Sequence, residues 1–312
     1  MRRPFIFATL AIALLYAVRS CEYAGIRRNK TGEFAKLRES FEEKNNYDLL
    51  VIGSSRAECE FYTPLIDSLT GLKTYNIGMT GAVMPFIRAT LEAYLVHSAP
   101  PKYVVLNLDL HSFSDNADTV YGFPRYFAYL DNEKLYEGLK ARDKRFPYFR
   151  YFAFYSMPYF TSKYFNASLR GWLNKPGKYN ADYVKGFAPH VKNTRLGDFD
   201  TMHIAKMNFP VPDYEWQEIE RIHAICQSNG IKLIFALVPL YHRWEERVVN
   251  YPEIVEEFRK YALQKNIPFI NMAHDSIRFN KNLYSDPAHL DKEGALLFTR
   301  NFCDSLGQYI GR

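Results

Sequence analysis

The amino-acid sequence predicts an α/β protein built on a doubly wound, mostly parallel sheet. Short apolar runs of strand length recur along the chain, and amphipathic stretches of helical length separate them. The runs show little alternation of polar and apolar residues, which is typical of parallel strands covered by helices on both faces. At 312 residues, 47% of them hydrophobic, the chain is long enough to bury a sizeable core.

The N-terminus predicts a membrane-targeting segment. Two arginines precede an apolar run over 5–18, and Arg19 follows it. The run is shorter than the roughly 20 residues that span a bilayer comfortably. An uncleaved anchor over residues 1–24, a cleaved signal and a lipoprotein modified at Cys21 therefore stay open. The two arginines favour an extracytoplasmic position for residues 25–312.

The expected elements then follow in a regular order. An amphipathic stem helix is expected over 31–44, where Phe34, Leu37 and Phe41 recur at helical spacing. After it, strands are expected at 47–53, 72–77, 103–110, 231–239 and 268–272. The helices of the main domain are expected at 85–98, 214–228, 252–265 and 291–306.

Residues from about 113 to 211 interrupt this order. Aromatic and basic residues mix there with frequent Pro, Gly and Asn, and the segment is too long for an ordinary connection. We expect an aromatic-rich insertion subdomain within the 25–312 domain. Its aromatic side chains suit packing on the main domain, contact with sugar rings or a membrane interface, and a lid over the site is a further alternative.

Two segments at predicted strand ends carry residues suited to nucleophilic catalysis. The first strand runs into Gly53-Ser54-Ser55, where a serine hydroxyl is exposed near the start of a helix. Asp286 stands three residues before His289, directly ahead of the last helix. A carboxylate at that spacing can reach the imidazole Nδ1 and leave Nε2 free to act as a base. The carboxyl ends of parallel strands gather the functional groups, so these residues are expected to meet.

Together these segments resemble the SGNH, or GDSL, hydrolase superfamily. Gly53-Ser54-Ser55 aligns with the block that holds the family's nucleophile, with Ser54 where Asp is usual, and Asp286-Pro287-Ala288-His289 matches the last block. The resemblance implies a three-layer α/β/α sandwich with a flavodoxin-like sheet and a triad of Ser55, His289 and Asp286. The anchored Gly-Ser-Ser form is similar to the branch of DltD-like and polysaccharide O-acetylation proteins.

The resemblance also implies an oxyanion hole formed by the amides of Ser55 and Gly78. The family's Gly-x-Asn-Asp block is missing, and Asn107-Leu108-Asp109 stands in its place. Three alternatives for the second donor stay open: His111, a backbone amide, or a hole that is assembled only when a partner binds. Arg56 is a candidate for binding a substrate anion, with a solvated or salt-bridged side chain as the alternative.

The expected function is serine-dependent acyl transfer or ester hydrolysis on a glycan or polymer of the bacterial cell envelope. The protein would act as an esterase or O-acyltransferase, held to the membrane by its N-terminal segment. One alternative is a non-catalytic, glycan-binding scaffold partner of a membrane-bound O-acyltransferase, and another is a lipase whose insertion forms an apolar tunnel.

Composition excludes other classes of function. The net charge of +6 is spread along the chain, which excludes a nucleic-acid footprint. The four cysteines and the histidines other than His289 show no metal-ligand spacing, so we expect no cofactor. Cys59 is expected in the core and not as a second nucleophile.

Overall fold

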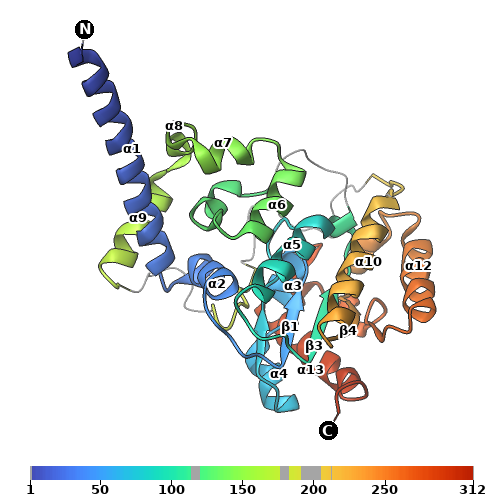
Figure 1. The fold of residues 1–312 in the computed structure, drawn as a ribbon. Coiled ribbons are helices and arrows are strands. Elements are labelled where there is room, and N and C mark those ends of the chain that lie inside the picture. The colour runs from blue at the N-terminus through green and yellow to red at the C-terminus, as the bar shows by residue number, and fades with distance from the viewer. Residues whose placement is uncertain (1, 114–119, 176–182, 191–204, 212, 312) are drawn as a thin grey trace.

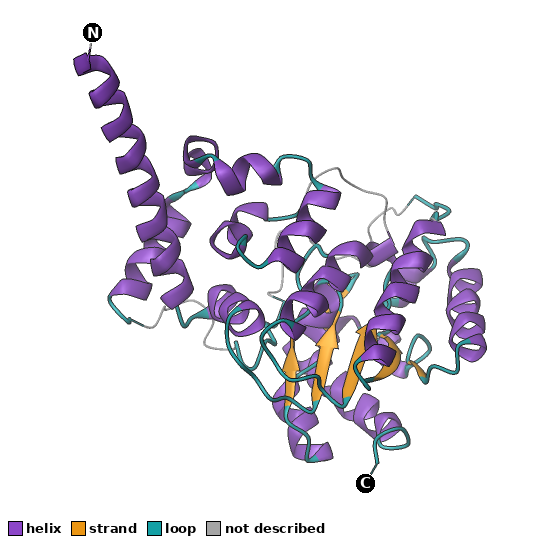
Figure 2. Ribbon diagram, in the orientation of Figure 1, coloured by secondary structure: helices purple, strands orange, loops and turns teal. Residues whose placement is uncertain are grey.

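A five-stranded sheet forms the centre of the molecule, shown in orange in Figure 2. The computed structural model describes residues 2–311 apart from 114–119, 176–182, 191–204 and 212. All neighbouring strands are parallel, in the order β2-β1-β3-β4-β5, which is the flavodoxin-like order. The strands are β1 (Leu49–Ile52), β2 (Thr74–Asn76), β3 (Tyr103–Asn107), β4 (Lys232–Leu237) and β5 (Phe269–Asn271).

Helices cover both faces of the sheet. In β1, Leu50 and Ile52 point into one apolar core while Leu49 and Val51 point into the other. The first core is closed by α5 (Met84–Leu95), α10 (Asp213–Ser228) and α12 (Tyr251–Gln264). The second is closed by α3 (Ser55–Glu60), α4 (Thr63–Thr70) and α13 (Lys292–Leu306). The predicted three-layer α/β/α architecture is confirmed. The strands are apolar throughout, as predicted, because helices bury both faces of the sheet.

All five expected strands and all four expected helices of the main domain are present. Each strand is shorter than the apolar run that predicted it, because the run continues into the flanking turns. The expected amphipathic helix forms as α2 (Gly32–Phe41). It packs on the body, with Leu37 and Phe41 buried and Lys36 fully enclosed.

The N-terminal helix α1 (Arg2–Arg28) projects from the body in Figure 1. It extends well beyond the apolar run, and its second half packs against α9 (Ser162–Trp172). By length and composition, Arg3–Arg28 could cross a membrane, with a mean hydropathy of 1.7. A signal sequence meets the same criterion, so the helix is compatible with either a signal anchor or a signal peptide.

The insertion is helical and packs on the main domain through part of its aromatic content. Phe123, Phe127, Phe149 and Tyr159 form one cluster, with ring centroids 4.5 to 6.2 Å apart. Its further elements are η2 (Phe123–Tyr129), α6 (Glu133–Arg142), α7 (Phe146–Tyr151), α8 (Ala153–Ser156) and η3 (Met157–Tyr159). The part of the expected insertion that falls on 114–119, 176–182 and 191–204 lies outside the described residues.

A small hairpin near the C-terminus was not predicted. It pairs β6 (Tyr284–Asp286) with β7 (His289–Leu290) in antiparallel fashion, directly before α13. Such short strands leave no periodic pattern in the sequence. The remaining short elements are η1 (Leu110–Phe113), α11 (His242–Glu245), η4 (Ser276–Phe279) and η5 (Lys281–Leu283).

Candidate active site

The turn after β1 presents Ser55 at the first position of α3. Gly53 has φ of +149°, and a Cβ atom there would lie 2.7 Å from that of Ala57, so both the backbone angle and the space require glycine. Ser54 is the N-cap of α3, and its hydroxyl accepts from the amide of Arg56 at 3.3 Å. This turn fixes the hydroxyl of Ser55 at the carboxyl edge of the sheet.

The structure brings Ser55, His289 and Asp286 into one hydrogen-bonded chain. Ser55 Oγ lies 2.8 Å from His289 Nε2, and His289 Nδ1 lies 3.0 Å from both carboxylate oxygens of Asp286. All three side chains are half-buried, so a substrate can still approach them. This arrangement can move a proton from the serine hydroxyl to the imidazole.

The hairpin turn holds the carboxylate in place. Asp286 Oδ1 accepts from the backbone amides of Ala288 and His289 at 2.8 and 2.9 Å. Because the same residue caps its own turn and contacts the imidazole, the three-residue spacing of Asp286 and His289 has a direct structural cause. The carboxylate cannot turn away from the ring without breaking the turn.

The pKa values of the two side chains move apart. Burial alone raises the pKa of Asp286, but the hydrogen bond and the charge attraction of His289 outweigh it, so the pKa of Asp286 is lowered. Burial alone lowers the pKa of His289, and the hydrogen bond and charge of Asp286 reverse this, so the pKa of His289 is raised above 6.5. Asp286 thus stays ionised and strengthens His289 as a base.

Arg56 has the salt-bridged, structural role that stood as the alternative to binding a substrate anion. Its side chain is only 5% exposed and donates to the carbonyl oxygens of Val238 and Pro239 at 3.0 and 2.7 Å. It also contacts Glu60, which in turn accepts from the amide of Leu290 in the hairpin. The charge is therefore used to tie α3 to the end of β4 and to the hairpin that carries His289.

A buried polar cluster lies behind the nucleophile. Asp109 accepts from the hydroxyl of Ser54 at 2.7 Å, from Ser112 Oγ at 2.9 Å and from Asn107 Nδ2 at 3.2 Å. These hydrogen bonds join the turn that carries Ser55 to the end of the neighbouring strand β3. The sequence shows these residues, but only the structure shows that they meet.

The expected oxyanion donors other than Ser55 fit less well. The amide of Gly78 donates to Asn76 Oδ1 at 2.9 Å, so this donor is already engaged within the protein. His111 lies exposed on η1, after β3. The observed geometry gives Gly78 no free hydrogen to offer, and the role of His111 stays a prediction.

His190, from the insertion, belongs to the site and was missed. Its ring stacks on that of His289 with a centroid separation of 4.4 Å and an angle of 4° between planes. Its Nδ1 lies 2.8 Å from Ser285 Oγ, and its Nε2 lies 3.7 Å from Asp286 Oδ2. Burial lowers the pKa of His190, as does the charge of His289, and together they outweigh the opposite effect of Asp286.

The segment that carries His190 is fastened to the main domain. The amide of Ala188 donates to the carbonyl of Glu58 on α3, and the amide of Asn76 on β2 donates to the carbonyl of Lys185. A Cβ atom on Gly186 would lie 1.8 Å from the Asn76 carbonyl, so only glycine allows this approach. No local pattern in the sequence predicts that this segment contacts β2 and α3.

His190, Asp286 and His289 also lie close enough to be considered as metal ligands, with ligand atoms within 4.8 Å of one another. The ring geometry does not fit. A metal bound by imidazole lies in the plane of the ring, and two parallel, stacked rings have no shared point in both planes. The cluster suits hydrogen bonding and proton transfer better than coordination.

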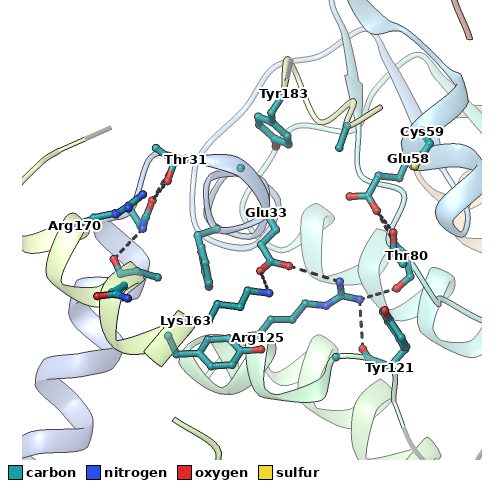
Figure 3. A pocket seen from close by; sticks show the side chains of 18 of the residues that line it. Thr31, Glu33, Glu58, Cys59, Thr80, Tyr121, Arg125, Lys163, Arg170 and Tyr183 are labelled. Atoms are coloured by element: carbon teal, nitrogen blue, oxygen red, sulfur yellow. Dashed lines mark hydrogen bonds and ion pairs between the residues drawn. The ribbon is translucent and has the colours of Figure 1, made fainter. Parts of the chain in front are cut away.

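A cavity of about 1080 Å³ adjoins this site. His190 and Cys59 are among the residues that line it, and Figure 3 shows the side chains of Arg125 and Lys163 pointing toward Glu33. Tyr121, Tyr164 and Tyr183 add aromatic surface to the lining. Cys59 belongs to the buried core as expected, and burial raises the pKa of its thiol.

Comparison with known proteins gives resemblance in fold only. No protein-family model matches the chain, and no curated protein is similar to it. Among solved structures it is similar to a lipolytic protein from Desulfitobacterium hafniense, proposed to belong to the G-D-S-L family, at 13% identity over 83% of this chain and 99% of that one, with a TM-score of 0.45. It is also similar to a proposed acylhydrolase from Bacteroides fragilis, at 12% identity over 87% and 93%, with a TM-score of 0.43. A GDSL-like lipase from Bacteroides thetaiotaomicron gives 14% identity over 83% and 88%, with a TM-score of 0.38.

Proposed function

We propose that this protein is a serine-dependent acyl-transfer enzyme, an esterase or O-acyltransferase, in which Ser55 is the nucleophile. The observation that carries the proposal is the unbroken hydrogen-bonded chain from Ser55 Oγ through His289 to Asp286. Each link has the length and the order that a nucleophile, a base and an orienting carboxylate need.

The reaction would proceed in two halves. His289 Nε2 takes the proton of Ser55, and Oγ attacks the carbonyl carbon of an ester. The tetrahedral oxyanion, held by the amide of Ser55, collapses, and the leaving alcohol takes the proton from His289. The acyl group now sits on Ser55. An acceptor hydroxyl then loses its proton to His289, attacks the acyl-serine and releases Ser55, which regains the proton.

We infer that the acyl acceptor or donor is a glycan or similar polymer of the cell envelope. The adjoining cavity is large, and tyrosines and charged side chains line it together, a combination that suits sugar rings and their hydroxyl groups. Its central charges, Arg125, Lys163 and Glu33, disfavour an acyl tail, which is what a lipase would have to bind. A glycan as acceptor makes the enzyme an O-acyltransferase, and water makes it an esterase.

The competing proposal is a non-catalytic scaffold that hands glycan to a membrane-bound O-acyltransferase. The engaged amide of Gly78 is the observation in its favour, because an incomplete oxyanion hole costs about a hundredfold or more in rate. Catalysis is favoured by the hydrogen bonds that orient Asp286 and His289 toward each other, because glycan binding alone does not require that arrangement.

Labelling with a fluorophosphonate probe separates the two. The full chain in detergent should be modified once, at Ser55, and Ser55→Ala and His289→Ala should abolish the labelling. His223→Ala, on the far helix α10, is the matched control and should label like the native chain. An unlabelled native chain, with its fold intact by circular dichroism, would support the scaffold.

A further inference from the structure

We propose that the insertion carries an aromatic belt that lies in the membrane interface beside α1, so that the site is held close to the bilayer surface. The belt consists of large apolar side chains that are exposed on and between three helices of the insertion. They are Tyr148, Tyr151, Phe152, Phe154, Phe165, Leu169, Trp172 and Leu173.

These side chains are concentrated and not scattered. Among the described residues outside α1, 15 large apolar side chains are exposed, and 8 of them fall within 148–173. Single exposed apolar residues are normal on any protein, whereas a cluster of this kind marks an interaction surface. We therefore expect the belt to be covered by an interaction partner.

The belt is fixed to α1 by specific contacts. Tyr16 donates to the carbonyl of Tyr151 at 2.6 Å, and Trp172 Nε1 donates to the carbonyl of Cys21 at 3.0 Å. A Cβ atom on Gly171 would lie 1.8 Å from the carbonyl oxygen of Gly25, so the two helices touch backbone to backbone. Figure 1 shows α9 along the second half of α1, with α8 beside it.

The length of α1 indicates what covers the belt. Its apolar run, 5–18, rises only about 21 Å in a helix, against roughly 30 Å of hydrocarbon in a bilayer. Side chains of this run such as Phe5, Leu10 and Leu14 are more than 60% exposed, as expected for lipid contact. An apolar run this short draws the residues that flank it into the interface, and the belt packs beside those residues of α1.

The chemistry of the belt suits that position. Tyr and Trp prefer the level of the lipid headgroups, where the ring is buried and the polar atom is wet. Basic side chains accompany them, with Arg28 3.8 Å from the centre of the Trp172 ring and Arg19 bonded to the carbonyl of Arg150. Positive charge at this level favours anionic lipids.

The belt also sets the distance of the reaction from the membrane, a step that rests on the proposed function. Trp172 lies level with Cys21, and Asn29, which lines the cavity, follows Cys21 by eight residues, or about 12 Å of helix and turn. Arg170 lines the same cavity two residues before Trp172. The substrate would thus be bound close to the bilayer surface.

Tryptophan fluorescence in lipid vesicles tests the belt without reference to catalysis. The chain has three tryptophans, so Trp216→Phe with Trp244→Phe leaves Trp172 alone, and Trp172→Phe with Trp244→Phe leaves Trp216, which packs against Phe113 and Phe258 in the core. Both full-length chains are placed in vesicles of phosphatidylcholine and phosphatidylglycerol with brominated acyl chains. Bromine should quench Trp172 by roughly twofold or more, and Trp216 hardly at all.

A pair of surface variants gives the matched control. Phe152→Asp with Phe154→Asp should relieve the quenching of Trp172, while Leu263→Asp with Phe279→Asp, two exposed positions elsewhere, should leave it unchanged. Equal quenching of Trp172 and Trp216 would overturn the belt and point to a protein partner on that surface. A chain that does not float with the vesicles would overturn it as well, because α1 would not be inserted.

Discussion

The main domain and the insertion contribute to the site in different ways. The main domain supplies Ser55, Asp286 and His289 from turns that are held by hydrogen bonds between near neighbours in the sequence, at Ser54 and at Asp286. The insertion supplies His190 through a segment that is fastened to β2 and α3 from far away in the sequence. Chemistry is therefore concentrated in local turns, while the surroundings of the chemistry come from long-range packing.

The same contrast appears in the aromatic residues. Those of the main-domain core are buried by the sheet and its helices, whereas those of the insertion are divided between a buried cluster around Phe149 and the exposed belt around Trp172. The buried rings of the insertion stabilise its fold, and the exposed ones form a patch that indicates an interaction surface. Substitutions in the main domain and in the insertion should therefore differ in whether they reduce the labelling rate or the free energy of unfolding.

The largest expected effect is on the triad. Asp286→Asn keeps the size of the side chain but turns an N–H toward His289 Nδ1, which forces the wrong tautomer. We expect the rate of fluorophosphonate labelling to fall by about 10⁴-fold, with the thermal midpoint of unfolding little changed. A labelling rate within tenfold of the native chain would show that the carboxylate does not orient the imidazole.

The second largest effect is a loss of stability, which we expect from a substitution in the buried aromatic cluster of the insertion. Phe149 is fully buried among Phe123, Phe127 and Phe146, so Phe149→Ala should lower the free energy of unfolding by about 3–5 kcal/mol. Tyr148→Ala, one residue away and half exposed, should cost less than about 0.5 kcal/mol. Equal losses in chemical denaturation would mean that the cluster is not a packed core.

A smaller effect on both rate and stability is expected at Asp109. Asp109→Asn places an amide against the hydroxyls of Ser54 and Ser112, and leaves buried donors facing each other. We expect about 2 kcal/mol of lost stability and roughly a tenfold or greater loss in labelling rate, since α3 and its Ser55 shift. Ser112→Ala removes one of these donors only and should give the milder result.

The smallest effect is expected at His190. His190→Ala removes the stacked ring and exposes His289 to water, so labelling should slow by about tenfold or less. The labelling rate of the native chain should rise with pH as His289 loses its proton, with a midpoint above 6.5 because Asp286 raises that pKa. In His190→Ala the midpoint should move further up, since His289 loses part of the burial that opposes its protonation. His190→Phe keeps the stacking and should stay near the native value.

The sequence predicted the parallel sheet and the segments that carry Ser55, Asp286 and His289, because buried strands and short turns are encoded by neighbouring residues. The strand order was implied only by the family resemblance. The sequence did not predict that Asp109 contacts Ser54, that Arg56 is buried, or that His190 reaches the site. Those facts depend on residues that meet across the fold, and one sequence carries no mark of such pairs. The burial of Lys36 in the predicted helix could not be foreseen for the same reason, since it needs Glu58 and the carbonyl of Gly186.

The most direct test of the acyl-transfer account is to trap the acyl group on the nucleophile. The full chain in detergent is mixed with p-nitrophenyl acetate, and the reaction is quenched in acid. The protein is then digested, and the masses of the peptides are measured by mass spectrometry. The account predicts one acetyl group on the peptide that contains Ser55, assigned to Ser55 by fragmentation and absent in Ser55→Ala and Asp286→Asn. An unmodified Ser55 under conditions in which p-nitrophenol is released, or an acetyl group that persists in Ser55→Ala, would contradict it.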